Sequence, residues 1–170
     1  LCASVFAPLF YVNERVTVQF NALSIKGALV GNLLFRGGEL RIPKEVEALQ
    51  GSLGSAFPIT RLHLSGKLSV GDFVFKNTGL LEIVGSEYLT SVGALAFAGT
   101  KLERIALGKE AKLGEFAFGG CESLTSVSGL WDIKSAKRTA FALCNSLDSG
   151  TLGTLYKKQW YISTEELLSE

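Results

Sequence analysis

The chain has 170 residues, 47% of them hydrophobic, and its 17 basic and 16 acidic residues leave a formal net charge of +1. This hydrophobic content excludes a disordered chain, and the length suits one domain with a sizeable core. The near-neutral charge argues against a nucleic-acid-binding protein, because such proteins carry a strong positive field.

The N-terminal segment, residues 1–12, holds ten apolar residues, a run too short to span a bilayer. It is either the remnant of a secretory signal or a hydrophobic cap over the first repeat, and the second interpretation makes residues 1–15 an N-terminal cap. Leucine precedes Cys2, where a lipidated cysteine needs a small residue, so lipidation is disfavoured. The absence of methionine predicts that a preceding segment was cleaved or left out.

A short motif that ends in phenylalanine recurs along the chain. Its best copies are VGDFVF at 70–75, VGALAF at 92–97 and LGEFAF at 113–118. The recurring phenylalanines are Phe35, Phe57, Phe75, Phe97, Phe118 and Phe141. Such a period is typical of a solenoid, in which each coil buries its apolar face only against its neighbours. We therefore expect the phenylalanines to stack as a spine.

A short apolar strand follows each motif at a steadier spacing. The strands centre on Val18, Leu40, Leu62, Ile83, Ile105 and Val127, with separations of 22, 22, 21, 22 and 22 residues. This spacing predicts six parallel strands in one sheet. The glycines at the motif starts, such as Gly71, Gly93 and Gly114, are expected to supply turns with positive φ. Small residues three positions after each phenylalanine predict a buried column with room only for small groups.

GEFAFGGCESLTSV at 114–127 and TAFALCNSL at 139–147 resemble the BspA-like leucine-rich repeats, the Treponema pallidum class, whose signature reads IGxxAFxxCxxLxxI. The resemblance covers residues 16–147, although glycine or threonine replaces the signature cysteine in four copies. It implies an α/β leucine-rich-repeat solenoid of about six coils of ~22 residues. One face would carry a parallel β-sheet and the other irregular or short helical segments. Six coils, an apolar N-terminus and no methionine also suit a spirochaetal origin.

The last segment, residues 148–170, does not repeat and is predicted to form a C-terminal cap. Ser163-Thr164-Glu165-Glu166 is a capping-box pattern for a short terminal helix. The chain is thus expected to be a single leucine-rich-repeat domain over residues 1–170, with the repeats at 16–147.

The sequence offers no candidate residues for catalysis or for metal or cofactor binding. His63 is the single histidine, and no motif typical of metal, phosphate or nucleophilic sites occurs. Cys121 and Cys144 fall in the small-residue column and are expected to be inert buried thiols, with a disulfide between them as the alternative. We therefore predict no enzyme, no catalytic residues, no metal site and no cofactor.

The outward residues of the strands define a predicted partner-binding face. They are Glu39, Arg41, Arg61, His63, Glu82, Val84, Arg104, Ala106, Ser126 and Ser128. In the first outward column, acid and base alternate over four consecutive coils. This column is either a self-satisfied ladder that sets strand register or a polar recognition face.

A second set of residues could form an apolar ligand patch near the C-terminal cap. It contains Val84, Ala106, Leu130, Trp131, Tyr156, Trp160 and Tyr161. In the alternative interpretation, the two tryptophans simply pack the last coil against its cap.

The resemblance implies a non-enzymatic, adhesion-type module that binds a host or envelope protein through the exposed sheet. It also implies an exported protein, in the periplasm, at the cell surface or outside the cell. The alternative function is a carrier of a small hydrophobic molecule, and a third is a structural spacer. We expect a monomer with no transmembrane span and no nucleic-acid partner.

Overall fold

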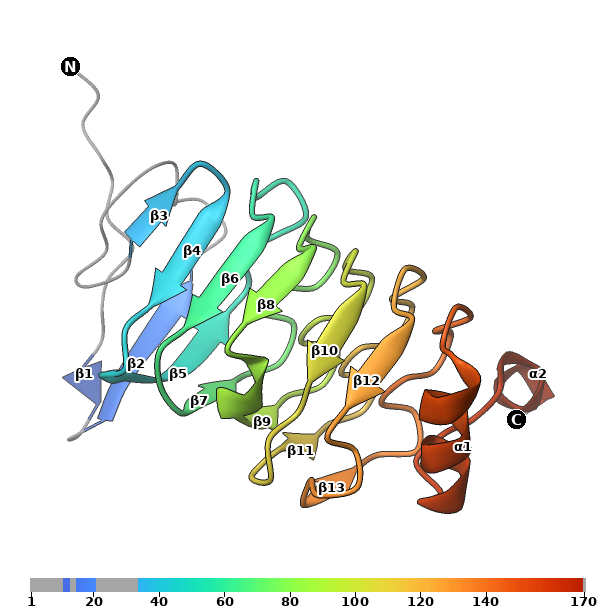
Figure 1. Cartoon of the computed structure of the whole chain (residues 1–170). Coiled ribbons are helices and arrows are strands. Elements are labelled where there is room, and N and C mark those ends of the chain that lie inside the picture. Colours follow the sequence, from blue (N-terminus) through green and yellow to red (C-terminus); the bar gives the residue numbers. More distant parts are fainter. Residues whose placement is uncertain (1–10, 13–14, 21–33, 170) are drawn as a thin grey trace.

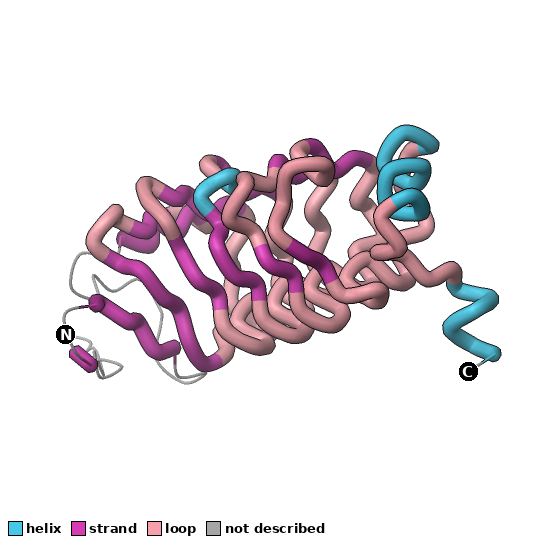
Figure 2. Tube along the Cα trace, turned by 90° about the horizontal axis from the view of Figure 1, so that it is seen from below, coloured by secondary structure: helices cyan, strands magenta, loops and turns pink. Residues whose placement is uncertain are grey.

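The computed structural model describes residues 11–12, 15–20 and 34–169. Each coil runs from a strand of a front sheet through a loop to a strand of a back sheet, and returns through a turn that carries a phenylalanine (Figure 1). The view from below shows these coils stacked side by side, with the two α-helices at the C-terminal end (Figure 2). Four complete coils begin at the turns of Phe57, Phe75, Phe97 and Phe118. The predicted solenoid is confirmed, although the described residues form about four complete coils where about six were expected.

The front sheet contains the strands that the period predicted from Leu40 onward. Its members are β3 (Leu34–Arg36), β4 (Glu39–Ile42), β6 (Arg61–Leu64) and β8 (Glu82–Val84), followed by the separate pair β10 (Arg104–Ala106) and β12 (Ser126–Ser128). All neighbours pair in parallel except β3 and β4, which form an antiparallel hairpin. Gly37 and Gly38 connect this hairpin with φ of 58° and 84°, which suits a tight turn with two positive φ values.

Within the described residues, the back sheet has seven strands. They are β1 (Tyr11–Val12), β2 (Arg15–Phe20), β5 (Val46–Gly51), β7 (Leu68–Val70), β9 (Leu89–Val92), β11 (Lys112–Leu113) and β13 (Ser135–Ala136). Only β1 and β2 pair antiparallel. The sequence led us to expect irregular or short helical segments on this side, but the structure has a second, largely parallel sheet there. One short helical segment, the 3-10 helix η1 (Ser86–Tyr88), leads into β9. Alternating apolar residues such as Leu68 and Val70 are buried from this second sheet, which gives each coil two apolar walls.

The strand around Val18 was predicted in the front sheet, and this prediction is wrong. Val18 belongs to β2, which pairs with β5 in the back sheet, and its register partner there is Leu49. The position beside β4 is already taken by β3 of the Gly37–Gly38 hairpin. The front sheet therefore has five of the six predicted strands, because a local hairpin competes with the repeat for the same edge.

The core contains a stack of four phenylalanine rings. Phe75, Phe97, Phe118 and Phe141 are fully buried, with centroid separations of 5.1, 5.3 and 5.4 Å and nearly parallel planes. Phe57 instead meets Phe35 at 4.7 Å with the rings tilted by 42°. The spine prediction is therefore confirmed for the last four copies, and the first two form a separate pair.

The small-residue column is confirmed from the third copy onward. Thr78, Thr100, Cys121 and Cys144 are all buried. Thr78 and Thr100 donate through Oγ1 to the carbonyls of the phenylalanines three residues earlier, at 2.8 Å. These hydroxyls satisfy turn backbone that would otherwise be buried without a partner.

Of the motif glycines, Gly54 has the expected positive φ of 76°, whereas Gly71, Gly93 and Gly114 act through close approach. Gly93 has an ordinary backbone, but a Cβ there would lie 2.6 Å from the carbonyl carbon of Gly71 in the preceding coil. Positive φ occurs instead two positions before the spine phenylalanines, at Phe73, Leu95 and Phe116, and two positions after them, at Asn77, Gly99 and Gly120. The expectation of positive φ at Gly71, Gly93 and Gly114 is thus wrong, because stacked coils leave no space there for a side chain.

The C-terminal end carries two helices. α1 (Ser149–Lys157) was not predicted, whereas α2 (Thr164–Ser169) begins with the predicted capping box. Glu166 Oε2 accepts from the Ser163 N–H at 3.0 Å, and the Glu166 N–H donates to Ser163 Oγ at 3.2 Å. The predicted N-terminal cap, residues 1–15, lies largely outside the described residues.

Candidate functional site

The predicted partner-binding face is the exposed side of the front sheet. In the first outward column Glu39 lies opposite Arg61, and Arg61 lies opposite Glu82. In the second column, Arg41, His63 and Val84 follow one another across the same strands. On the other strand pair, Arg104 lies opposite Ser126 and Ala106 opposite Ser128. Both predicted columns are therefore present on this face, although strand hydrogen bonds do not join β8 to β10.

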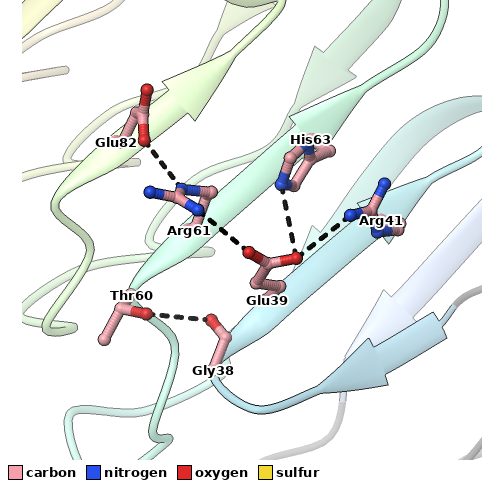
Figure 3. Close-up of polar contacts among 7 residues, drawn as sticks. All are labelled: Gly38, Glu39, Arg41, Thr60, Arg61, His63 and Glu82. Atoms are coloured by element: carbon pink, nitrogen blue, oxygen red, sulfur yellow. Dashed lines mark hydrogen bonds and ion pairs between the residues drawn. The ribbon is translucent and has the colours of Figure 1, made fainter.

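An ion-pair network joins the first three strands of this face (Figure 3). Arg61 donates from Nη1 to Glu39 at 3.0 Å and from Nε to Glu82 at 2.7 Å. Arg41 donates to the other oxygen of Glu39 at 3.1 Å. The Arg61 guanidinium lowers the pKa of Glu39, and the two carboxylates raise the pKa of Arg61. These charges satisfy one another and are poorly placed to attract a charged partner.

His63 completes this cluster without a hydrogen bond. Its Nε2 lies 3.6 Å from Glu39 Oε2, beyond hydrogen-bonding distance, and is buried with no partner among the described residues. The neighbouring Arg41 and Arg61 already occupy both oxygens of Glu39. The Nε2 atom of His63 is therefore not available to a partner at this face.

The predicted four-member charge ladder ends after its third member. Among the described residues Arg104 forms no ion pair, although Glu82 is the acid nearest to it in the column. The ladder breaks because β8 and β10 are not joined by strand hydrogen bonds. The N–H of Ala106 instead donates to Ser86 Oγ at 3.1 Å, so a side chain from η1 takes the place of a strand carbonyl. Sequence inspection missed Ser86, because a serine inside a loop gives no sign of this role.

The part of the face on β8, β10 and β12 carries one cation, Arg104, that has no ion pair among the described residues. Val84, Arg104, Ala106 and Ser128 are exposed and Ser126 is half-buried. The other outward residues of β10 and β12, which are Ala106, Ser126 and Ser128, have small side chains, so a partner could approach the backbone of these strands closely. This surface differs in chemistry from the self-neutralised network on β4, β6 and β8.

The predicted apolar patch is only partly present. Leu130 is 2% exposed and belongs to the core, so its assignment to a surface patch is wrong. Its position in the loop after β12 turns it toward the interior, whereas its neighbour Trp131 is 57% exposed. Val84 and Ala106 lie on β8 and β10 of the front sheet, whereas the aromatic residues lie in the loop after β12 and in the cap. The seven residues therefore do not form one surface.

The aromatic residues of the cap gather around Lys158. Its Nζ lies 5.0 Å from the Trp131 ring centroid and 5.4 Å from that of Trp160, and donates to the Trp131 carbonyl at 3.2 Å. Tyr156 meets Tyr161 edge to face at 5.2 Å. Trp160 and Tyr161 also pack against the core. Lys158 thus links the last coil to the cap by cation–π contacts, a role that the Lys157-Lys158 pair before Trp160 could have suggested.

The remaining chemistry-bearing residues are covered. Cys121 and Cys144 are buried free thiols, whose Sγ atoms donate to the carbonyls of Phe97 and Phe118 at 3.2 and 3.0 Å. Among residues 11–12, 15–20 and 34–169, no cluster of three or more His, Cys, Asp or Glu side chains could hold a metal ion. None of the helices in the described part of the chain is long and apolar enough to cross a membrane.

Comparison with known proteins agrees with this architecture. The BspA type leucine-rich repeat region matches residues 54–159 in six copies. The curated proteins contain no match. A crystal structure of a leucine-rich repeat protein from Bacteroides ovatus is similar, with a TM-score of 0.54 and 22% sequence identity, over 81% of this chain and 39% of that chain. This chain thus spans well under half the length of that protein, and the likeness shows the fold alone. Because the repeat region matches more than half of its residues, the chain belongs to the BspA-type leucine-rich repeat family.

Proposed function

We propose that this protein is a non-enzymatic, adhesion-type module that binds a protein partner through the half of the front sheet from β8 to β12. The observation that carries the proposal is the exposed Arg104 side chain, which has no ion-pair partner among the described residues and shares its strand pair with the small outward residues Ala106, Ser126 and Ser128. An arginine in such a position can form paired hydrogen bonds to a carboxylate of the partner. Arginine is also enriched among residues that dominate binding energy.

The geometry of the face supports this role. Val84, Ala106, Ser126 and Ser128 lie on strands held by a continuous stack of coils, so the surface is rigid and little conformational freedom is lost on binding. The network of Glu39, Arg61 and Glu82 would form one border of the interface, where exposed ion pairs contribute specificity more than affinity.

The test is capture of purified host matrix and envelope proteins by the immobilised chain, followed by variant analysis of any pair that binds. Arg104→Ser and Ser128→Trp are each expected to weaken binding by about tenfold or more, through loss of the cation or through steric block. Lys112→Ser, an exposed cation on the back sheet, is the matched control and should leave binding unchanged. A partner that binds both front-sheet variants as tightly as the wild type would refute this assignment of the site.

A second candidate function is binding of a small hydrophobic molecule at the C-terminal end. It rests on the exposed rings of Trp131 and Tyr156, which are 57% and 54% exposed. Native mass spectrometry of protein purified without detergent would detect a bound lipid-like mass, and Trp131→Ala with Tyr156→Ala should remove it. A clean mass of the bare chain would count against this function.

Location outside the cytoplasm and a spirochaetal origin both extend from the family assignment. BspA-type repeat proteins are typically surface or exported proteins, and we include export in the proposal. Protease treatment of intact cells, compared with lysed cells, tests it: cleavage only after lysis would exclude exposure at the surface. Organisation as a single domain and the spirochaetal origin stay predictions.

A further inference from the structure

The buried small-residue column ends in two neighbouring thiols. Cys121 and Cys144 occupy its last two positions, in neighbouring turns of the stack, whereas the two turns before them carry threonine. The Gly120 N–H donates to the Ala142 carbonyl at 2.9 Å, so backbone hydrogen bonds join the two turns next to the cysteines. Parallel neighbours that are hydrogen-bonded in this way lie roughly 5 Å apart, within the range of about 4.4–6.8 Å that a disulfide needs between its Cα atoms. The backbone therefore permits a bond between the two sulfurs.

The two thiols are in contact. Cys144 Sγ donates to the Phe118 carbonyl at 3.0 Å, and the same carbonyl accepts from the Cys121 N–H at 3.3 Å. The sulfur of one cysteine and the backbone of the other therefore meet at one oxygen atom. The thiols also hydrogen-bond to each other, and this contact lowers the pKa of Cys121 and raises the pKa of Cys144. Because Cys121 Sγ also donates to the Phe97 carbonyl, its rotation toward Cys144 is the movement that a disulfide requires.

The carbonyls that accept from the two S–H groups have other donors. The Phe97 carbonyl accepts from Cys121 Sγ at 3.2 Å and also from the Thr100 hydroxyl at 2.8 Å. The Phe118 carbonyl accepts from the Cys121 N–H as well as from Cys144 Sγ. A buried acceptor is costly when it has no donor at all, so the column tolerates the loss of its two thiol protons.

We propose that Cys121 and Cys144 are a redox-sensitive site, which closes to a disulfide when the chain folds in an oxidising compartment. The bond would staple the last two turns of the stack together beneath the C-terminal cap, and the free thiols of this structure are its reduced form. The site lies in the interior and is independent of the partner-binding face. It depends on the proposed export only for the presence of an oxidant, since oxidising compartments maintain disulfides that the cytosol reduces.

The reaction is thiol–disulfide exchange with a low-molecular-weight disulfide, for which oxidised glutathione is the probe. The thiolate of one cysteine attacks a glutathione sulfur, forms a mixed disulfide and releases one glutathione thiolate. The thiolate of the second cysteine attacks the protein sulfur of this mixed disulfide and releases the second glutathione thiolate. The two cysteines lose two electrons in total, which the glutathione disulfide gains, and the two thiol protons end on the two glutathione molecules.

Burial determines when the exchange occurs and how it ends. Cys121 is 0% and Cys144 1% exposed, so glutathione reaches them only while the last turns or the cap are open, as during folding. The closed column has room only for small side chains, so an attached glutathione prevents closure until the second thiol displaces it. The same burial then shields the finished disulfide from reductants in solution.

Refolding of the full chain from urea in a mixture of reduced and oxidised glutathione tests the proposal. The product should be lighter by two hydrogen atoms than protein refolded in dithiothreitol. Peptide mapping without reduction should join the peptide that contains Cys121 to the one that contains Cys144. A chain that stays a dithiol, a lasting glutathione adduct, or pairing of either cysteine with Cys2, which lies outside the described residues, would overturn the proposal.

Thermal unfolding distinguishes a staple that fits the fold from a strained cross-link. Closure of a loop of about 24 residues should raise the melting temperature by about 5–10 °C over the dithiol form, and dithiothreitol should reverse this gain once the chain is unfolded. Cys121→Thr is the matched control, because buried threonines fill the same position in the two preceding turns. It should melt at one temperature with and without glutathione disulfide. An equal gain in Cys121→Thr, or a cross-linked wild type that melts no higher than its dithiol form, would refute the staple.

Discussion

The backbone N–H of Val127 donates to Thr151 Oγ1 at 3.1 Å, so a helix side chain satisfies the last strand of the front sheet. In β4, β6 and β10 the corresponding edge pairs with the next strand of the front sheet. β12 has no following strand, and α1 covers its edge, with Thr151 only 5% exposed. The Asp148 N–H adds a second bond, to the Thr125 carbonyl at 2.7 Å. The helix thus ends the solenoid by hydrogen bonding as well as by packing.

We expect Thr151→Val to lower the free energy of unfolding by about 1–3 kcal/mol, because the buried Val127 N–H loses its acceptor. Urea denaturation followed by circular dichroism measures the change. Thr154→Val is the matched control in the same helix, since Thr154 donates only to the Gly150 carbonyl within α1. Equal losses in both variants would mean that the effect is on helix propensity and not on the sheet edge.

The start of α1 predicts a pH dependence. Asp148 Oδ1 accepts from the Thr151 N–H at 2.6 Å, and this bond lowers the pKa of Asp148. A carboxylate with a lowered folded-state pKa stabilises the fold above its unfolded pKa, and this contribution is lost as the pH falls through the folded pKa. Asn caps helices about as well but does not titrate. The stability advantage of the wild type over Asp148→Asn should therefore shrink as the pH is lowered from about 5 to about 2.

Thermal unfolding at several pH values checks this prediction. Asp132→Asn serves as the control, because Asp132 is exposed and caps no helix. A difference between wild type and Asp148→Asn that grows on acidification would contradict the assigned direction.

The phenylalanine stack predicts a large stability loss at its centre. Phe97 is fully buried between Phe75 and Phe118, at 5.1 and 5.3 Å. Phe97→Ala should lower the free energy of unfolding by about 3–5 kcal/mol, because neighbouring coils cannot collapse into the cavity. Tyr88→Ala removes an aromatic ring that is 42% exposed and should have a far smaller effect in the same denaturation experiment. A small loss in Phe97→Ala would mean that the coils are not packed tightly around the spine.

The two buried cysteines should resist alkylation in the native protein. Both are at most 1% exposed, and the neighbouring Cys121 thiol together with burial raises the pKa of Cys144. Because iodoacetamide cannot reach a buried sulfur, and because the Cys144 thiol is also kept protonated, the reagent should modify Cys121 and Cys144 only after unfolding. Peptide mapping by mass spectrometry gives the readout, and Ser128→Cys on the exposed sheet is the positive control. Rapid native modification of Cys144 would refute its placement in the interior.

The front-sheet face shows where prediction from sequence ends. Alternation along each strand correctly placed Glu39, Arg61 and Glu82 in one column, because side chains two residues apart share a face. It could not place Arg104 relative to Glu82, since that depends on whether β8 and β10 are hydrogen-bonded. The Oγ of Ser86, twenty residues from its partner in the chain, takes the place of a strand contact there.

The cap gives a second example. The capping box at Ser163–Glu166 is local, and its helix was predicted correctly. α1 was missed, because its sequence SGTLGTLYK contains two glycines and little helical periodicity. It is stabilised by the contacts of Thr151 and the buried Leu155 with the last coil, which only the folded chain provides. For the same reason, Leu130 lies in the core while Trp131 remains exposed.

The sequence by itself determined the coil length, the spine of Phe75, Phe97, Phe118 and Phe141, and the small residues behind it. These features recur because every coil packs against a neighbouring coil of the same shape, so each copy of the repeat needs the same buried residues. Only the tertiary structure decided that β2 joins the back sheet, that the front sheet is interrupted after β8, and that Phe73, Leu95 and Phe116 have left-handed backbones. Each of these depends on competition between segments far apart in the chain or on how one coil rests on the next, which no single copy of the repeat encodes.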